Sequence, residues 1–293
     1  MSTPVATPTL PAALRLGAVE LTVGDLGRSV AFYEGSLGLQ VHRREGVRAA
    51  MGAGGEDLLR LAEEPGARPA GRHAGLFHLA LLYPGRTELA GALARLVAAR
   101  TPLSGAADHG VSEALYLADP DGNGLELYAD RPREQWPAPA APGERVGMFT
   151  APLDVRDLLQ AAGDNAPPAA PPRLIMGHVH LHVGDIAQGL GCYRDVLGFE
   201  LMQEFGGTAA FVSAGGYHHH LAFNVWRGQG VGPAPAGTVG LREWTVVLET
   251  AQQVDAVRAR ATAADAIVED DPGGGLLARD PWDISARFVS DRG

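Results

Sequence analysis

The chain has 293 residues, of which 46% are hydrophobic and 20% are charged, a balance typical of a globular protein long enough for two domains. A formal net charge of −10 argues against nucleic acid or an anionic membrane as a partner. The single cysteine, Cys192, excludes an internal disulfide and favours a reducing cytoplasm. No apolar run reaches the roughly 20 residues that a membrane span needs. Residues 1–13 lack the pattern of a secretory signal and are predicted to form a disordered arm.

The first part of the chain, residues 14–131, is predicted to form two βαβββ modules. The alternating segment AVELTV predicts a strand, and Asp25 is placed to cap a helix that ends at Gly38. Short strands continue to residue 62. The pattern then restarts with the strand GLFHLALLY, an amphipathic helix over 87–100, and two strands around the turn DPDGNG.

Residues 132–173 are rich in proline and alanine and are predicted to form a semi-rigid linker or surface strap. Within it, residues 153–164 have the pattern of a short helix that packs on a domain. The segment shows no chemistry of its own.

The second part, residues 174–293, repeats the first. Residues 17–25 read GAVELTVGD and residues 177–185 read GHVHLHVGD, which are 160 residues apart. A helix over 186–199, strands up to residue 226, a strand over 240–250, a helix over 251–264 and final strands complete a third and a fourth module. Only the second copy has histidines on its first strand, at positions 178, 180 and 182.

The paired modules, the VGDL…FY…LG opening and the DPDGNGLELY closing resemble the vicinal oxygen chelate superfamily of glyoxalases, bleomycin-resistance-type proteins and extradiol dioxygenases. The sequence is most similar to two-domain catechol 2,3-dioxygenase-like proteins. This resemblance implies an α+β fold of two domains. Each domain would contain paired βαβββ modules whose curved mixed sheets enclose a metal site.

The resemblance places metal ligands at His78, Glu126 and His178. Two histidines and one carboxylate leave open positions on Fe(II), and Mn(II) suits the same donors. An inward carboxylate at Glu126 is costly unless it is paired or metal-bound. The run from Asp119 to Gly124 also resembles a calcium loop, but that loop requires flanking helices, so a plain hairpin turn is the favoured interpretation.

The two copies complement each other. The first copy has Ala18 where the second has His178, and the second copy has Glu243 and Arg287 at the positions of His78 and Glu126. Neither copy has a full ligand set. We therefore predict one complete site formed across the two copies and one pseudo-site without a workable ligand set.

Further roles follow from the resemblance. It gives His219 the part of an acid–base residue, and it places His109 and Tyr116 beside the substrate oxygens. Strand alternation predicts that His219, Leu221 and Phe223 share a face, and His218 is interpreted as a solvated loop residue. The expected pocket lining consists of His180, His182, Phe223 and Trp244.

The leading hypothesis from the resemblance is an Fe(II) extradiol dioxygenase that acts on a small aromatic diol and dioxygen. One alternative is a glyoxalase-like isomerase or lyase. That enzyme would need a fourth ligand, at the position of Ala222 or from His220. Another alternative is a metal-free binding protein of the resistance type. The substrate and the oligomeric state stay open.

Overall fold

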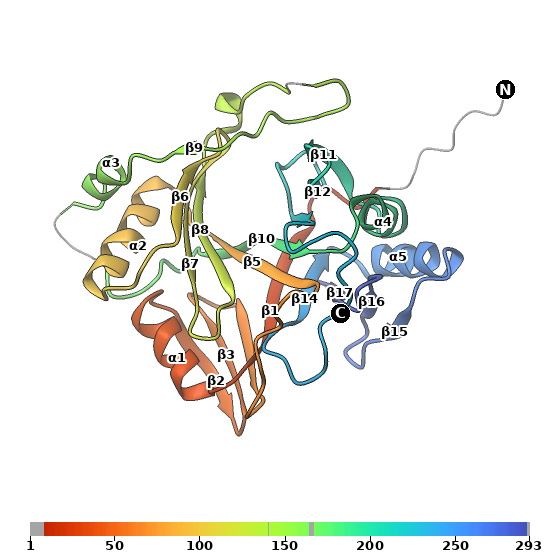
Figure 1. Ribbon diagram of the computed structural model, residues 1–293, viewed down its shortest axis with the longest axis horizontal. Helices are drawn as coiled ribbons and strands as arrows, with labels where there is room; N and C mark the ends of the chain where they lie inside the picture. The colour runs from red at the N-terminus through yellow and green to blue at the C-terminus, as the bar shows by residue number, and fades with distance from the viewer. Residues whose placement is uncertain (1–8, 140, 164–166, 292–293) are drawn as a thin grey trace.

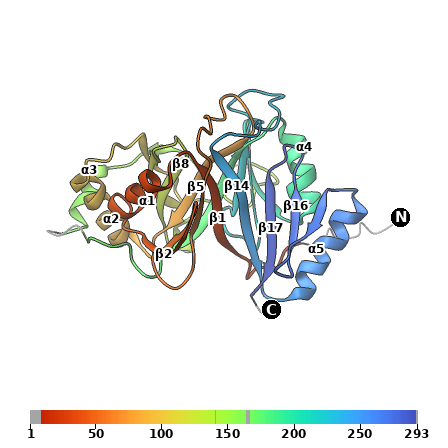
Figure 2. The ribbon, with the colours of Figure 1, turned by 90° about the horizontal axis from the view of Figure 1, so that it is seen from below.

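The computed structural model describes residues 9–139, 141–163 and 167–291. Two mixed sheets form the middle of the molecule, with α1, α2 and α3 on one side and α4 and α5 on the other (Figures 1 and 2). The expected α+β fold with curved mixed sheets is confirmed. The proposed domain limits, 14–131 and 174–293, stay a prediction.

Sheet I joins the first module to the fourth, in the order β15-β16-β17-β14-β1-β4-β3-β2. The first module supplies β1 (Arg15–Val23), β2 (Gln40–Glu45), β3 (Arg48–Gly52) and β4 (Leu59–Glu63). The fourth module supplies β14 (Gly240–Leu248), β15 (Val268–Asp270), β16 (Leu276–Arg279) and β17 (Ser285–Ser290). The central contact is the antiparallel pairing of β1 with β14.

Sheet II joins the second module to the third, in the order β11-β12-β13-β10-β5-β8-β7-β6-β9. The second module supplies β5 (Gly75–Leu82), β6 (Gly105–Asp108), β7 (Ser112–Ala118) and β8 (Gly124–Asp130). The third module supplies β10 (Ile175–His182), β11 (Glu200–Phe205), β12 (Ala209–Ser213) and β13 (Leu221–Asn224), and the linker adds β9 (Ala151–Pro152). Both sheets therefore combine strands from the two sequence copies.

The helices begin where the sequence predicts. Asp25 and Asp185 cap α1 (Leu26–Gly35) and α4 (Ile186–Leu190), because each carboxylate accepts a backbone N–H three residues later. α2 (Arg86–Ala98) and α5 (Ala251–Ala263) match the expected amphipathic segments. The segment 186–199, predicted to be a single α-helix, is not continuous. α4 ends after five residues and is followed by a π-helical segment, η2 (Gly191–Val196). Glycines at 189 and 191 flank this change and weaken the α-helix there.

A tyrosine–aspartate hydrogen bond joins the two sheets in each copy. Tyr33 of α1 donates to Asp119 Oδ2 over 2.9 Å, and Tyr193 of η2 donates to Asp280 Oδ2 over 2.5 Å. Asp119 Oδ1 also accepts the backbone N–H groups of Asp121 and Asn123, at 2.9 and 2.8 Å. Strands flank this segment on both sides, so the hairpin-turn interpretation is confirmed.

One continuous apolar core fills the space between the sheets. Leu79 of β5, Leu181 of β10 and Trp244 of β14 are all buried in it. Trp244 therefore belongs to the core, which corrects its expected place in the pocket lining. Within the described residues, no helix is both long and apolar enough to cross a membrane.

The N-terminal arm and the linker pack against this body. Residues 1–8 of the predicted disordered arm lie outside the described residues. Leu10, by contrast, is buried and donates its N–H to the carbonyl of Gly198 over 2.7 Å. In the linker, η1 (Arg133–Gln135) precedes β9, and the expected short helix is α3 (Val155–Gln160), with Asp154 as its cap.

Candidate metal centre and pocket

Three neighbouring strands of sheet II bring His78, Glu126 and His178 onto one face. β5 lies between β10 and β8, and its Ala80 is directly opposite both His178 and Glu126. Because alanine has a small side chain, the imidazole and the carboxylate can converge across it. His78 is two residues from Ala80 on the same strand and therefore points to the same side.

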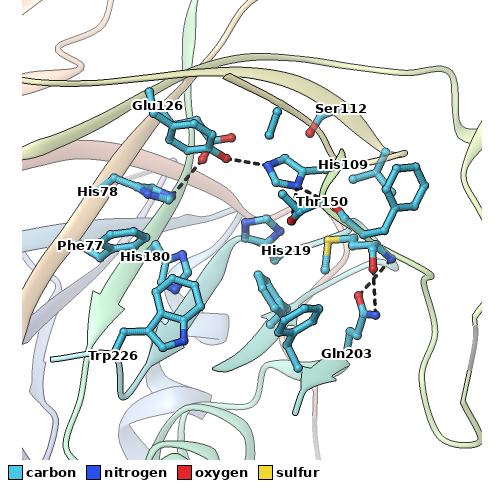
Figure 3. Close-up of a pocket in the computed structure, with 17 residues that line it drawn as sticks. Phe77, His78, His109, Ser112, Glu126, Thr150, His180, Gln203, His219 and Trp226 are labelled. Carbon is cyan, nitrogen blue, oxygen red and sulfur yellow. Dashed lines mark hydrogen bonds and ion pairs between the residues drawn. The ribbon is translucent and has the colours of Figure 1, made fainter. Parts of the chain in front are cut away.

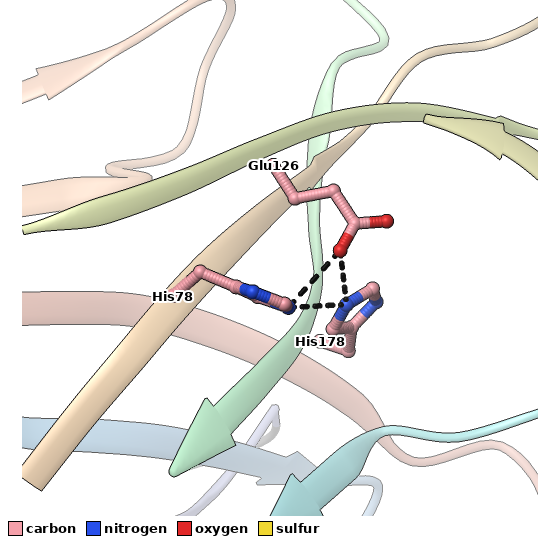
Figure 4. A group of neighbouring side chains, drawn as sticks. All are labelled: His78, Glu126 and His178. Carbon is pink, nitrogen blue, oxygen red and sulfur yellow. Dashed lines mark hydrogen bonds and ion pairs between the residues drawn. The ribbon is translucent and has the colours of Figure 1, made fainter. Parts of the chain in front are cut away.

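The three side chains meet at a single point (Figure 4). Glu126 Oε2 lies 3.0 Å from His78 Nε2 and 3.2 Å from His178 Nε2, and the two Nε2 atoms are 3.3 Å apart. Ligand atoms at right angles around an ion and about 2.1 Å from it would lie about 3 Å apart. The spacing therefore fits three donors on one face of a divalent ion.

The protonation states also suit a cation. Burial by itself would raise the pKa of Glu126, but His178 and His78 outweigh it and hold this pKa well below its usual range. Burial lowers the pKa of His178 to about 4. An ionised carboxylate beside a neutral imidazole is the state that binds metal, and a buried negative charge needs a positive partner. His178 Nδ1 is also buried without a hydrogen-bond partner among the described residues.

A glycine allows β8 to approach this point. A Cβ atom on Gly124 would lie only 2.0 Å from the carbonyl oxygen of Phe77. Gly124 pairs with His78 in the sheet, so its missing side chain sets the distance between the two strands that carry His78 and Glu126.

The equivalent face of sheet I contains an ion pair instead. Arg287 Nε donates to Glu243 Oε1 over 2.5 Å, and Arg287 Nη1 lies 3.0 Å from Asp271. Glu243 is directly opposite Glu20, as His78 is opposite His180 in sheet II. The guanidinium supplies the positive charge at this face, and Ala18 offers no donor. This arrangement agrees with the predicted pseudo-site.

His219 lies beside the three converging residues. Its ring centroid is 4.1 Å from that of His178, and its ring lines the cavity in front of the cluster (Figure 3). The prediction that His219 shares a strand face with Leu221 and Phe223 is wrong, because those two side chains lie in the core and His219 lines the cavity. β13 begins only at Leu221, so residues 217–220 bend and strand alternation does not extend back to His219.

His218 is buried, which corrects its interpretation as a solvated loop residue. Its Nε2 lies 2.9 Å from Asp130 Oδ1, and its Nδ1 lies 2.8 Å from His219 Nδ1. An ionised carboxylate only accepts hydrogen bonds, so His218 Nε2 donates to Asp130. In the neutral tautomer of His218, which has its one proton on Nε2, Nδ1 accepts a hydrogen bond from His219 Nδ1. His219 Nε2 is then the unprotonated nitrogen. Burial lowers the pKa of His219 well below its usual range, which keeps the ring neutral.

His109 and Tyr116 form a second pair at the opposite wall of the cavity. His109 Nδ1 donates to the carbonyl of Phe149 over 2.9 Å, so its Nε2 accepts the Tyr116 hydroxyl over 2.7 Å. Burial and the neighbouring Glu126 raise the pKa of Tyr116 well above its usual range, so the phenol stays protonated.

The cavity has a volume of about 290 Å³. Of the predicted lining residues only His180 lines it, since His182 is bonded to Asn224 over 2.8 Å and Phe223 lies in the core. Sequence reasoning missed the strap residues 148–150, which cover one side. It also missed Gln203, which holds the Met148 backbone through bonds of 3.1 and 3.2 Å. The proline-rich composition of the strap contained no signal for this contact.

Neither candidate for a fourth ligand joins the cluster. Ala222 is opposite His180 in the sheet and has no donor atom. His220 Nδ1 is bonded to Ser213 Oγ over 2.8 Å. Among the described residues, only His78, Glu126 and His178 converge closely enough to hold an ion together, with ligand atoms within 4.8 Å of one another.

Comparison with known proteins identifies the same superfamily that the sequence motifs resemble. Residues 15–127 and 175–282 match the model of the glyoxalase/bleomycin resistance protein/dioxygenase superfamily. The chain is 43% identical over 282 residues to a Bacillus subtilis protein named catechol-2,3-dioxygenase, with 94% of this chain and 96% of the relative covered.

Two solved structures share the fold. Glyoxalase I from Zea mays matches with a TM-score of 0.58 at 17% identity, over 95% of this chain and 92% of that one. The cppA protein from Streptococcus pneumoniae matches with a TM-score of 0.57 at 13% identity, over 94% of this chain and all of that one.

Proposed function

Because this chain belongs to the glyoxalase/bleomycin resistance protein/dioxygenase superfamily, we propose that it is an Fe(II)-dependent extradiol dioxygenase acting on a catechol-type diol. The observation that carries this proposal is the convergence of His78, Glu126 and His178 at the wall of a cavity. The name of the 43%-identical Bacillus subtilis relative supports the same reaction class.

The three converging side chains would hold the iron and leave one side of it open toward the cavity. When bound, iron would supply the binding positions for the two diol oxygens and for dioxygen, and its charge would favour the ionised diol. Two neutral imidazoles and one carboxylate leave a net positive charge at such a site. Mn(II) would suit the same donors.

His219 would take the proton of one diol hydroxyl at Nε2. Its other nitrogen is held by His218, which in turn is held by Asp130. These two contacts would keep Nε2 of His219 unprotonated, and the His219 ring lines the cavity. A neutral imidazole at that place can accept the proton and return it to an oxygen later in the reaction.

Tyr116 and His109 would bind the other diol oxygen. The phenol of Tyr116 has a single proton, so it would donate to an anionic oxygen by turning that proton away from His109 Nε2, which lies 2.7 Å from its oxygen. Because His109 is bonded to the carbonyl of Phe149, the strap contributes to the position of this pair. Strap residues 148–150 also line the cavity.

Metal content and oxygen consumption test the proposal. After metal removal and anaerobic addition of Fe(II), we expect the protein to retain iron and to consume oxygen with catechol, forming a yellow ring-opened product. His78→Ala, Glu126→Ala and His178→Ala should each lose iron. His42→Ala is the matched control, since His42 lies on β2 in sheet I and is bonded to Asp57. Iron retained at full level by all three variants would contradict the site.

The isomerase alternative gives a different result. It requires a fourth protein ligand, and the described residues provide three at this point. An iron-loaded protein that consumes no oxygen with any catechol would favour the isomerase and refute the dioxygenase.

A further inference from the structure

The outer part of the cavity has an exposed aromatic rim, formed by Phe149, Phe205 and Trp226. These side chains belong to the strap, to β11 and to the segment after β13, and they are 44%, 52% and 51% exposed. Large aromatic side chains gathered at the mouth of a pocket usually contact a ligand. Phe77 continues this surface inward, with its ring centroid 5.3 Å from that of Trp226.

Outside the candidate metal centre, the lining of the cavity contains no arginine or lysine. None of its 17 lining residues is an arginine, and the chain contains no lysine. Arg227 follows the rim residue Trp226, but its Nη1 donates to the carbonyl of His73 over 3.1 Å. Arg131 near the strap is bonded to Asp108 and Glu113, at 2.7 and 3.0 Å.

Two polar side chains of the outer cavity, Gln203 and His180, are also occupied. Gln203 uses its amide for both hydrogen bonds to Met148. His180 Nε2 accepts from Asn224 Nδ2 over 2.8 Å. A carboxylate on a substrate ring would therefore lose its water without gaining a charged partner in the outer cavity.

We propose that the preferred substrate is an uncharged catechol whose alkyl or aryl substituent extends from the ring toward Phe149, Phe205 and Trp226. This inference rests on the proposed dioxygenase function. The rim would select for apolar substituents and against carboxylate-bearing ones. Each methylene placed against such a surface improves binding by about fourfold when it is fully buried.

Two catechols with side chains of similar size test the selection. They are 4-propylcatechol and 3-(3,4-dihydroxyphenyl)propanoate, compared with catechol itself. We expect kcat/KM from oxygen uptake to be at least about tenfold higher for the propyl compound than for the propanoate. Anaerobic titration of the Fe(II) protein, followed by tryptophan fluorescence, should give the same order of Kd values.

The outcomes separate this inference from the proposed function. If none of the catechols supports oxygen uptake, the proposed dioxygenase activity is refuted. The anaerobic Kd values would still report whether the rim prefers the propyl compound. Oxygen uptake in which the propanoate equals or exceeds the propyl compound would leave the dioxygenase intact and overturn the inference.

A charge placed on the rim gives a second test. Phe205→Arg should raise the kcat/KM ratio of propanoate to propyl compound by about tenfold, because the guanidinium provides the missing partner. Ile267→Arg is the matched control, since Ile267 is 62% exposed and lies outside the cavity lining. An unchanged ratio in both Phe205→Arg and Trp226→Arg would overturn the assignment of the rim.

Discussion

In the proposed function, Asp130 determines through His218 which nitrogen of His219 carries the proton, although Asp130 does not line the cavity. Its Oδ1 lies 2.9 Å from His218 Nε2, and His218 Nδ1 lies 2.8 Å from His219 Nδ1. In Asp130→Asn, the amide nitrogen can donate to His218 Nε2. His218 would then carry its proton on Nδ1, and His219 would carry its own on Nε2, the nitrogen that the proposed function requires to be free.

The magnitude follows from the loss of the carboxylate charge in this hydrogen bond. A hydrogen bond to a charged group contributes about 1.5–3 kcal/mol, and we use about 2 kcal/mol because the Asp130 side chain is 25% exposed. This loss corresponds to a decrease in kcat/KM of about 30-fold.

The assay is oxygen uptake with catechol by the Fe(II) protein, with iron content measured on the same sample. Asp195→Asn is the matched control, because Asp195 is an exposed residue paired with its neighbour Arg194. Iron content should be unchanged in both variants. A kcat/KM for Asp130→Asn within about twofold of the unmodified protein would refute the reasoning.

Two further predictions concern the framework. Gly124→Ala should push β8 away from Phe77. It should lower iron retention and lower the free energy of unfolding by about 1–3 kcal/mol or more. Gly191→Ala should do neither, because a Cβ atom at Gly191 would meet no atom within 4 Å. Chemical denaturation and metal analysis compare the two variants, and equal effects would contradict the close approach. Burial raises the pKa of Asp280 to about 6. Folding therefore favours its protonated form, and the free energy of unfolding should fall by about 2–3 kcal/mol as pH rises from about 4 to 6. Asp280→Asn should remove that part of the pH dependence. If the free energy of unfolding, measured by chemical denaturation, falls with pH equally in both proteins, the prediction is refuted.

The sequence predicted the parts of this protein that depend on neighbouring residues. The caps at Asp25 and Asp185, the hairpin turn after Asp119 and the main amphipathic helices follow from local hydrogen bonding and periodicity. The complementary loss of donors at Ala18 and Arg287 also predicted that a single site would be shared by the two copies. These features are local or compositional, so the order of residues contains them.

Other features depend on contacts between distant segments, and the tertiary structure alone decided them. The place of His219 depends on a bend before β13 that strand periodicity does not reveal, and the burial of His218 depends on Asp130 from another module. The strap reaches the cavity through Gln203, which lies 55 residues from Met148 in the sequence. The residue types of the candidate metal centre could therefore be read from the chain. Their convergence depends on β5 pairing with β10 of the other copy along one edge and with β8 of its own copy along the other, which are contacts between segments far apart in the sequence.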